Sequence, residues 1–574
     1  MFNHTIGRIG RLVAVIAAAA PVAGFAAAPL GIGRIGHIVV IYGENRSFDH
    51  EYGSFPGARG LQNLPSAAYR QIDRDGHTVL TVLPPVWGGV IDSHLLGLAP
   101  PFPRLTQIAQ SATENMPAQP FAINDPKGFG LAPNVATRDL YHRFYENQMQ
   151  IHGGRNDMFA AWADSGGLTM GHYSYQRETD ETAYVPLYGL AKKYVLADNF
   201  FQAAFGGSYL NHQFLICACA PILTPSQQTR RRTATRGDPV VVPVSAIHAA
   251  PDGTGPVLDT TSTSPPSALT GPPIYTASTN LAPADADGNF ATINTMQPPY
   301  PPSGNGFGRG GLNAAGIALS PAVPQIGVNP DAPTTVPPQT LTTIGDLLSA
   351  ANISWAWYAG AMNEAIAKGT YNGADGRDAR GNLVPNFQPH HNPFNYYANF
   401  APGSAARALH LRDGGLNGAR FIADIDHNAL PAVSFYKPQG NLNAHPSYSD
   451  ITSGDAATYD IVVNHLMKSP AWHDMVIVIT YDENGGWWDH AAPPKGDQFG
   501  PGTRVPALIV SPFAKLATVD HTQYDTDSIL RLIARRYGLP KLPGIARRDA
   551  ALSHNGFPAM GDLTNALVLV RDER

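Results

Sequence analysis

His37-Ile-Val-Val-Ile-Tyr42 decides the fold, because this run is short, rich in β-branched residues and unbroken by polar side chains. Such a run is typical of a strand buried on both faces, as the strands of a parallel sheet are. It leads directly into Gly43-Glu44-Asn45, and the same order recurs where Met475-Val-Ile-Val-Ile-Thr480 leads into Tyr481-Asp482-Glu483. In open α/β sheets ligands bind beyond the carboxyl ends of the strands. We therefore expect the two acidic turns to share one site.

Further elements extend this pattern along the chain. Ala507-Leu-Ile-Val-Ser511 predicts a third strand, and residues 139–151 and 527–537 have the apolar spacing of helices, the second capped by Asp527 or Ser528. Strands that alternate with helices predict an α/β sandwich.

The composition is that of a globular protein without a nucleic-acid partner. Of the 574 residues, 43% are hydrophobic and only 14% are charged, unlike a disordered chain. The formal net charge of −5 leaves no overall basic field to hold nucleic acid or an anionic membrane surface.

The first residues predict export. Arg8 and Arg11 precede an apolar run from Leu12 to Gly24, and small residues follow, so residues 1–26 resemble a secretory signal peptide cut after Ala26. The run is shorter than the roughly 20 residues that span a bilayer, and no other segment has the pattern of a transmembrane span. We expect a periplasmic or secreted protein with one catalytic domain over residues 27–574.

Two features inside this domain stand apart. Residues 221–338 are crowded with Pro, Gly, Thr and Ser, which predicts a long insertion or lid. Just before it, Cys217 and Cys219 lie in an apolar stretch, and a bridge between such close neighbours would be strained in a helix. We expect two buried thiols there.

The strand-end residues predict a metal site. Glu44, Asn45, Asp482 and Glu483 offer oxygen donors, and no histidine or thiolate is required among them. This donor set suits a hard divalent cation, namely Mg²⁺, Ca²⁺, Mn²⁺ or iron, better than a closed structural zinc.

Histidines and one serine complete the candidate site. The histidines lie in irregular segments, where functional residues collect, and are His142, His390, His391 and His445. A histidine can bind a phosphate oxygen or protonate a leaving group. Ser208 follows Gly206-Gly207 at the start of an apolar, helix-like stretch, so it is either a nucleophile beside helix N–H groups or a plain helix cap.

Three longer motifs surround these candidate residues, namely Glu44-Asn-Arg-Ser-Phe-Asp-His50, Thr480-Tyr-Asp-Glu-Asn-Gly-Gly-Trp-Trp-Asp-His490 and Gly500-Pro-Gly-Thr-Arg-Val-Pro506. They resemble signatures of the bacterial phosphoesterase family, which contains phospholipases C and acid phosphatases. The resemblance runs from Ile38 to about Gly538 and implies an alkaline-phosphatase-like α/β/α sandwich with a mostly parallel central sheet.

The resemblance also implies roles for individual residues. One divalent metal ion would be held by Glu44, Asn45, Asp482 and Glu483, with Ser208 completing its shell as the attacking group. Asn45 would also touch the substrate phosphate. The phosphate would be surrounded by His142, His391 and His445, with His390 close by, and His445 would serve as general acid.

The stretch around Ser208 distinguishes branches of this family. Phospholipase C members tend to carry Gly-Pro-Thr at the nucleophile, whereas Gly206-Gly-Ser-Tyr-Leu-Asn211 is similar to the acid phosphatase branch. We therefore predict an exported acid phosphatase that hydrolyses small phosphate esters through a phosphoserine, with most activity on the acid side of neutral. The alternatives are a phospholipase C and a non-catalytic exported metal-binding protein. The sequence does not fix an oligomeric state.

Overall fold

The computed structural model describes residues 31–96, 105–126, 128–175, 185–227, 247–249, 256–258, 264–274, 280–282, 285–301, 335–368 and 386–569. The predicted signal peptide and much of the predicted insertion lie outside these residues. Among the helices of the described chain, none has both the length and the apolar character needed to cross a membrane.

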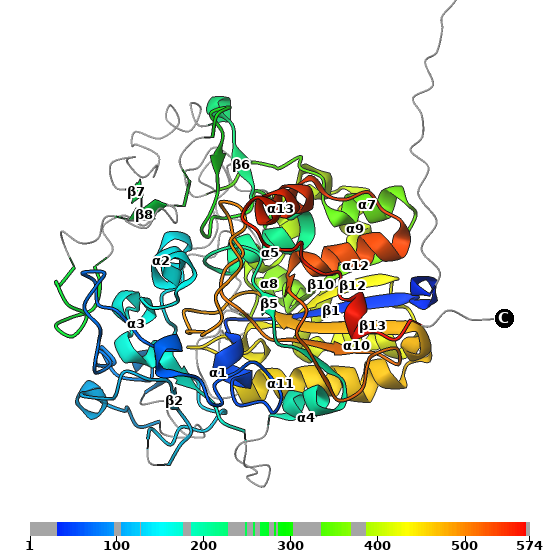
Figure 1. The fold of residues 1–574 in the computed structure, drawn as a ribbon. Helices are drawn as coiled ribbons and strands as arrows, with labels where there is room; N and C mark the ends of the chain where they lie inside the picture. Colours follow the sequence, from blue (N-terminus) through cyan, green and yellow to red (C-terminus); the bar gives the residue numbers. More distant parts are fainter. Residues whose placement is uncertain are drawn as a thin grey trace, which may run out of the picture.

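The centre of the molecule is an eight-stranded sheet whose inner strands are almost entirely buried (Figure 1). In order across the sheet the strands are β11 (Leu411–Gly415), β10 (Trp355–Gly360), β12 (Val433–Lys437), β1 (His37–Gly43), β13 (Met475–Tyr481), β14 (Ala507–Val510), β4 (Val195–Ala197) and β15 (Thr518–Asp520). Only β14 runs against its neighbours β13 and β4. The other pairings are parallel, so the predicted mostly parallel sheet is confirmed.

Helices cover both faces of this sheet, which makes the α/β/α sandwich (Figure 1). One face carries α5 (Ser208–Cys217), α7 (Ile344–Ala350), α9 (Ala405–His410), α12 (Asp527–Tyr537) and α13 (Pro543–His554). The other face carries α4 (Pro186–Lys193), α10 (Ala419–Asp426) and α11 (Ile451–Tyr459). Because both faces are covered, β1 and β13 could be apolar without interruption, and Ile38 to Ile41 are fully buried.

Smaller elements lie beyond the carboxyl end of β1 (Figure 1). These include α1 (Phe48–Tyr52), α2 (Phe144–Ile151) and α3 (Phe159–Trp162), whereas α8 (Met362–Lys368) follows β10. Within the segment 221–338, β6 (Ile222–Leu223) pairs with β9 (Phe290–Ala291), and β7 (Ile247–Ala249) with β8 (Pro256–Leu258).

The predicted helices need two corrections. Residues 527–537 form α12 as predicted, but its N-cap is Thr526 and no side chain bonds the first turn. The helix predicted over 139–151 begins only at Phe144. Tyr141 N–H bonds the Asp164 carboxylate at 3.0 Å, and the Phe144 N–H bonds the Asn294 side chain at 3.1 Å, so long-range partners hold this segment extended.

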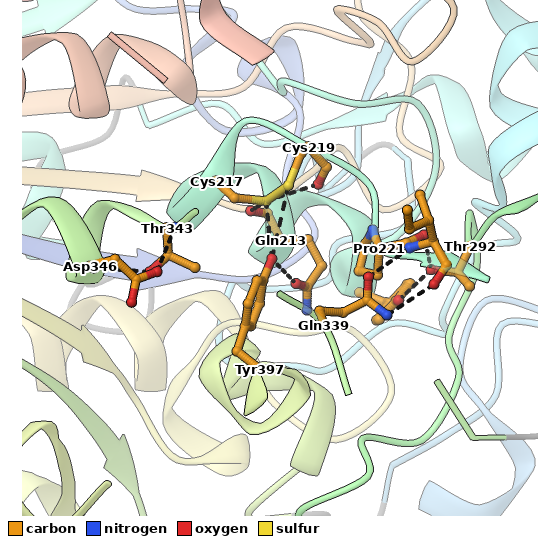
Figure 2. The surroundings of a disulfide bond; sticks show 11 residues. Gln213, Cys217, Cys219, Pro221, Thr292, Gln339, Thr343, Asp346 and Tyr397 are labelled. Carbon is orange, nitrogen blue, oxygen red and sulfur yellow. Dashed lines mark hydrogen bonds between the residues drawn. A yellow bond between two sulfur atoms is a disulfide. The ribbon is translucent and has the colours of Figure 1, made fainter. Parts of the chain in front are cut away.

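The prediction of two free thiols at Cys217 and Cys219 was wrong, because these residues form a disulfide (Figure 2). A bridge would be strained only if the helix continued through both cysteines. Instead α5 ends at Cys217, and Ala218 adopts a left-handed conformation with φ of 50°. This turn brings the two Cα atoms to 5.1 Å, within the usual range for a disulfide.

Candidate active site

The two acidic turns after β1 and β13 lie against each other. Asn45 N–H donates to Asp482 Oδ1 at 3.1 Å, and Arg46 N–H donates to the Glu483 carbonyl at 2.9 Å. The close approach requires glycine at position 485, because a Cβ atom there would come within 2.6 Å of the Asn45 Cβ. The sheet thus brings together the two segments that the sequence separates by more than 400 residues.

Ser208 is the first residue of α5 and lies close to the turn after β1. Its Oγ donates to Glu44 Oε2 at 3.2 Å. The N-cap of the helix is Gly207, and no side chain caps the first turn, so Ser208 is not the plain helix cap of the alternative hypothesis. Gly206 has a φ of 81°, and a Cβ atom there would lie 2.6 Å from the Phe144 backbone nitrogen, so glycine is needed where α5 meets α2.

The carboxylates of the two turns are buried and crowded. Burial and the charge of Asp482 raise the pKa of Glu44 to about 8, and the same two causes raise the pKa of Glu483 well above its usual value. Asn45 Oδ1 and Asp482 Oδ2 accept no hydrogen bond from any described residue. Buried oxygens without a donor, beside carboxylates that repel one another, fit a hard cation with oxygen ligands.

Two compact groups of ligand-type side chains occur among the described residues. One consists of Glu44, His212 and His391, whose candidate ligand atoms lie within 4.8 Å of one another, so it shares Glu44 with the predicted metal site. The other consists of Asp49, Asp489 and His490. In the second group Arg504 donates to Asp49 and to Asp489, each at 3.0 Å, and its charge already compensates the carboxylates.

The four predicted histidines line one cavity together with Ser208. The cavity has a volume of about 460 Å³. Near Asn45 Nδ2 lie His445 Nε2 at 3.1 Å and His142 Nε2 at 3.4 Å. On the other side His391 Nδ1 lies 3.2 Å from Glu44 Oε1, and the rings of His390 and His391 are 4.3 Å apart. The four histidines and Ser208 therefore line the same cavity.

Burial acts on the charge of these rings. It lowers the pKa of His390 to about 3 and also lowers the pKa of His391 and His445, with Lys437 contributing to each shift. The neutral rings are favoured. Burial thus works against the prediction that one of these histidines is protonated near neutral pH.

Two site residues were missed by the sequence analysis. Lys437 ends β12, and its Nζ contacts the Glu44 carboxylate and donates to the Tyr42 carbonyl at 3.1 Å. His212 lies one turn after Ser208, and its ring stacks on His391 at 4.8 Å. The signal for Lys437 was the short apolar run Val433-Ser-Phe-Tyr, a parallel strand whose carboxyl end meets the same edge as β1.

Parts of the chain are similar to known phospholipases C. It is 32% identical over 170 residues to Phospholipase C B of Mycobacterium tuberculosis, which covers 25% of this chain and 31% of that protein. It is 32% identical over 185 residues to Non-specific phospholipase C1 of Arabidopsis thaliana, with coverages of 27% and 34%. The chain thus spans about a third of the length of these curated relatives.

Among solved structures, one protein of the alkaline phosphatase superfamily from Vibrio parahaemolyticus covers 37% of this chain and 50% of its own, at 11% identity and a TM-score of 0.22. A score this low supports no inference about the site. The model of the Phosphoesterase family, by contrast, matches residues 35–540, and the chain belongs to this family.

Proposed function

We propose that this protein is a metal-dependent phosphoric ester hydrolase that acts on phosphate monoesters, with Ser208 as its nucleophile. The observation that carries the proposal is the position of Ser208. Its hydroxyl lies at the N-terminus of α5, lines the histidine-walled cavity and contacts Glu44 at 3.2 Å. The N–H groups of a helix N-terminus favour negative charge, such as that of a phosphate.

The proposed reaction has two steps. Ser208 loses its hydroxyl proton to solvent, and its Oγ forms a bond to phosphorus as the bond from phosphorus to the leaving-group oxygen breaks. The leaving oxygen takes a proton from His445, the general acid of the proposal, whose protonated form is favoured by the negative charge of a bound phosphate. Water then attacks phosphorus and gives a proton to His445, the bond from phosphorus to Ser208 Oγ breaks, and Oγ takes a proton from solvent, which releases inorganic phosphate and restores the serine.

Other residues of the site bind and orient the substrate. His142, His390 and His391 face the non-bridging oxygens, and Asn45 Nδ2 is a further donor toward the cavity. One divalent cation, Mg²⁺, Ca²⁺, Mn²⁺ or iron, would be held by Glu44, Asn45, Asp482 and Glu483 with Ser208. When bound, it would lower the pKa of the serine hydroxyl and neutralise phosphoryl charge.

Acid phosphatase is the preferred activity, and phospholipase C is the second candidate. The stretch Gly206-Gly-Ser-Tyr-Leu-Asn211, with serine at the nucleophile position, supports the first. The relatives from Mycobacterium tuberculosis and Arabidopsis thaliana are named as phospholipases C, which supports the second. We also propose a periplasmic or secreted location, which the Cys217–Cys219 disulfide supports because disulfides persist in oxidising compartments.

A pair of assays tests this function. The purified protein, loaded with each candidate metal, is offered p-nitrophenyl phosphate and p-nitrophenyl phosphorylcholine from pH 4 to pH 9. The proposal expects faster hydrolysis of the monoester, with the greatest kcat/KM on the acid side of neutral. Preference for the phosphorylcholine ester would favour the phospholipase, and hydrolysis of neither ester would contradict both.

A further inference from the structure

The cavity has a second wall, which comes from the segment 221–338. Three residues of this segment, Asn280, Asn294 and Thr295, line the same space as Ser208. The segment is also fixed to the helix that carries the serine, because Tyr209 and Thr292 share a hydrogen bond of 2.7 Å between their hydroxyl groups. Figure 2 shows Thr292 beside Pro221. The Thr292 N–H donates to the Pro221 carbonyl at 2.8 Å.

The same segment is fixed to the start of α2, next to His142. The side-chain oxygen of Asn294 accepts the Phe144 N–H at 3.1 Å. The side-chain oxygen of Asn280 accepts a hydrogen bond from Arg143 Nη2 at 2.7 Å. Helix α5, which carries Ser208, and the segment that leads from His142 into α2 therefore both hold this wall in place.

Arg143 brings a permanent positive charge to the wall. It lines the cavity directly after His142, and its guanidinium is a positively charged group with several N–H donors. Among the described residues that line the cavity, none is Asp or Glu. Glu146 on α2 feels the charge of Arg143 but is buried, does not line the cavity, and has a pKa that burial raises to about 7.

Arg143 bonds to a residue outside the groups that we assign to phosphate binding. His142 and His445 lie near Asn45, and His391 lies near Glu44, so histidines enclose the proposed phosphate site on the side of the acidic turns. The guanidinium is held instead by Asn280, on the wall that the segment 221–338 provides. A group bonded to the phosphate and pointing away from the acidic turns would meet this wall.

We propose that Arg143, held in place by Asn280, determines leaving-group specificity: it favours phosphate monoesters whose leaving group is anionic and disfavours those whose leaving group is cationic. This inference rests on the proposed function. A fixed charge near the leaving group changes kcat/KM through differential stabilisation of the bound substrates. A quaternary ammonium head group, such as that of a choline ester, would be repelled at this wall.

Three aryl phosphates that differ in one charge test the proposal. They are phenyl phosphate, 4-carboxyphenyl phosphate and 4-(trimethylammonio)phenyl phosphate, and the quantity measured is the ratio of kcat/KM for the anionic ester to that for the cationic ester. Intrinsic reactivity differs among the three esters but cancels when variant and wild-type ratios are compared. Arg143→Gln should lower the ratio about tenfold, equivalent to about 1.4 kcal/mol, and should change hydrolysis of phenyl phosphate much less.

Two further variants test whether a change in the ratio comes from the charge of Arg143. Asn280→Asp should lower the ratio in the same direction, because a carboxylate beside Arg143 neutralises its charge without removing it. Arg535→Gln is the matched control, since Arg535 lies on α12 and pairs with Asp562 at the surface. Its ratio should equal that of the wild type.

The outcomes separate this inference from the proposed function. If the wild type hydrolyses phenyl phosphate and the ratio is the same in wild type, Arg143→Gln and Asn280→Asp, the specificity role is wrong and the proposed function stands. If the wild type hydrolyses none of the three esters, the proposed function is wrong and this inference falls with it.

Discussion

Lys437 places a positive charge where the acidic turns are most crowded. Its side chain is 3% exposed and contacts Glu44. Lys437→Met would leave the Glu44 carboxylate buried without its cationic partner, and breaking such a pair costs roughly 3–5 kcal/mol. A bound divalent cation would supply the missing charge, so the loss should be larger in EDTA than in the metal-loaded protein.

Guanidinium unfolding with and without EDTA measures this difference. Lys541→Met is the control, because Lys541 pairs with Asp549 at the surface and should cost about 1 kcal/mol or less under both conditions. If Lys437→Met lowers the free energy of unfolding equally in EDTA and in the metal-loaded protein, no cation lies near Glu44.

Among individual site residues, the sequence predicted those that directly follow recognisable strands. Glu44 and Asp482 each follow an unbroken apolar run, and parallel strands bring such ends to one edge. The position of Lys437 could not be predicted in the same way, because β12 was not recognised. His212 was passed over because a histidine inside a helix has no local feature that separates a site residue from a core residue.

Among the elements, α5 joins the candidate nucleophile at one end to the disulfide at the other. Replacing Cys217 and Cys219 with alanine should lower the free energy of unfolding by about 1–2 kcal/mol, since the loop that the disulfide closes is very short. The kcat should change little, because the length of α5 places Ser208 roughly 14 Å from Cys217.

Denaturation with and without reductant provides the control. Reduction should destabilise the wild type and leave the double-alanine variant unchanged. Titration of two free thiols in the unreduced, denatured wild type would contradict the disulfide.

The contact between α12 and α13 makes stability depend on pH. Burial raises the pKa of Asp549, but hydrogen bonds and charges from Arg531 and Lys541 outweigh it and hold the pKa below 3.8. A lowered pKa in the folded state adds stability above the unfolded value, and this is lost as the pH falls through the folded value. Asp549→Asn should therefore destabilise at pH 7, by no more than about 1 kcal/mol because the pair is partly exposed.

Thermal melts of wild type and Asp549→Asn from pH 7 to pH 2 test this sign. The difference in Tm should be largest near neutral pH and shrink below about pH 4. A difference that grows as the pH falls would refute the assignment.

Element boundaries depended on which partners the backbone finds. Local apolar spacing placed α12 correctly, because that helix packs one continuous apolar face. The same spacing failed for residues 139–143, where Asp164 and Asn294 supply long-range hydrogen bonds that a single sequence does not reveal.

At the scale of the whole molecule, the proposed metal would join the acidic turn after β1 to the acidic turn after β13. Asp482→Asn keeps the shape of the side chain but removes one of the charges that would hold a divalent cation. We expect elemental analysis to find much less metal in this variant and kcat to fall with it. Asp549→Asn is the control and should keep its metal; full metal content in Asp482→Asn would count against these ligands.

The α/β/α architecture could be predicted from the sequence, but the order of the strands in the sheet could not. The apolar runs of β1 and β13 are each long enough to read as buried strands, and both faces of the sheet are indeed covered. The central order β12-β1-β13 joins strands that are hundreds of residues apart, and β4 is only three residues long. Such pairings depend on packing across the whole chain, which local periodicity does not encode.

The central claim is that Ser208 attacks phosphorus, and trapping the phosphoenzyme tests it most directly. The metal-loaded protein is mixed with a phosphate ester, quenched within milliseconds in acid, digested and examined by peptide mass spectrometry. We predict a phosphorylated peptide with the modification on Ser208, and a folded Ser208→Ala variant with neither the modification nor measurable turnover. A folded Ser208→Ala variant with unimpaired kcat, together with no phosphorylated Ser208 in the wild type, would contradict the claim.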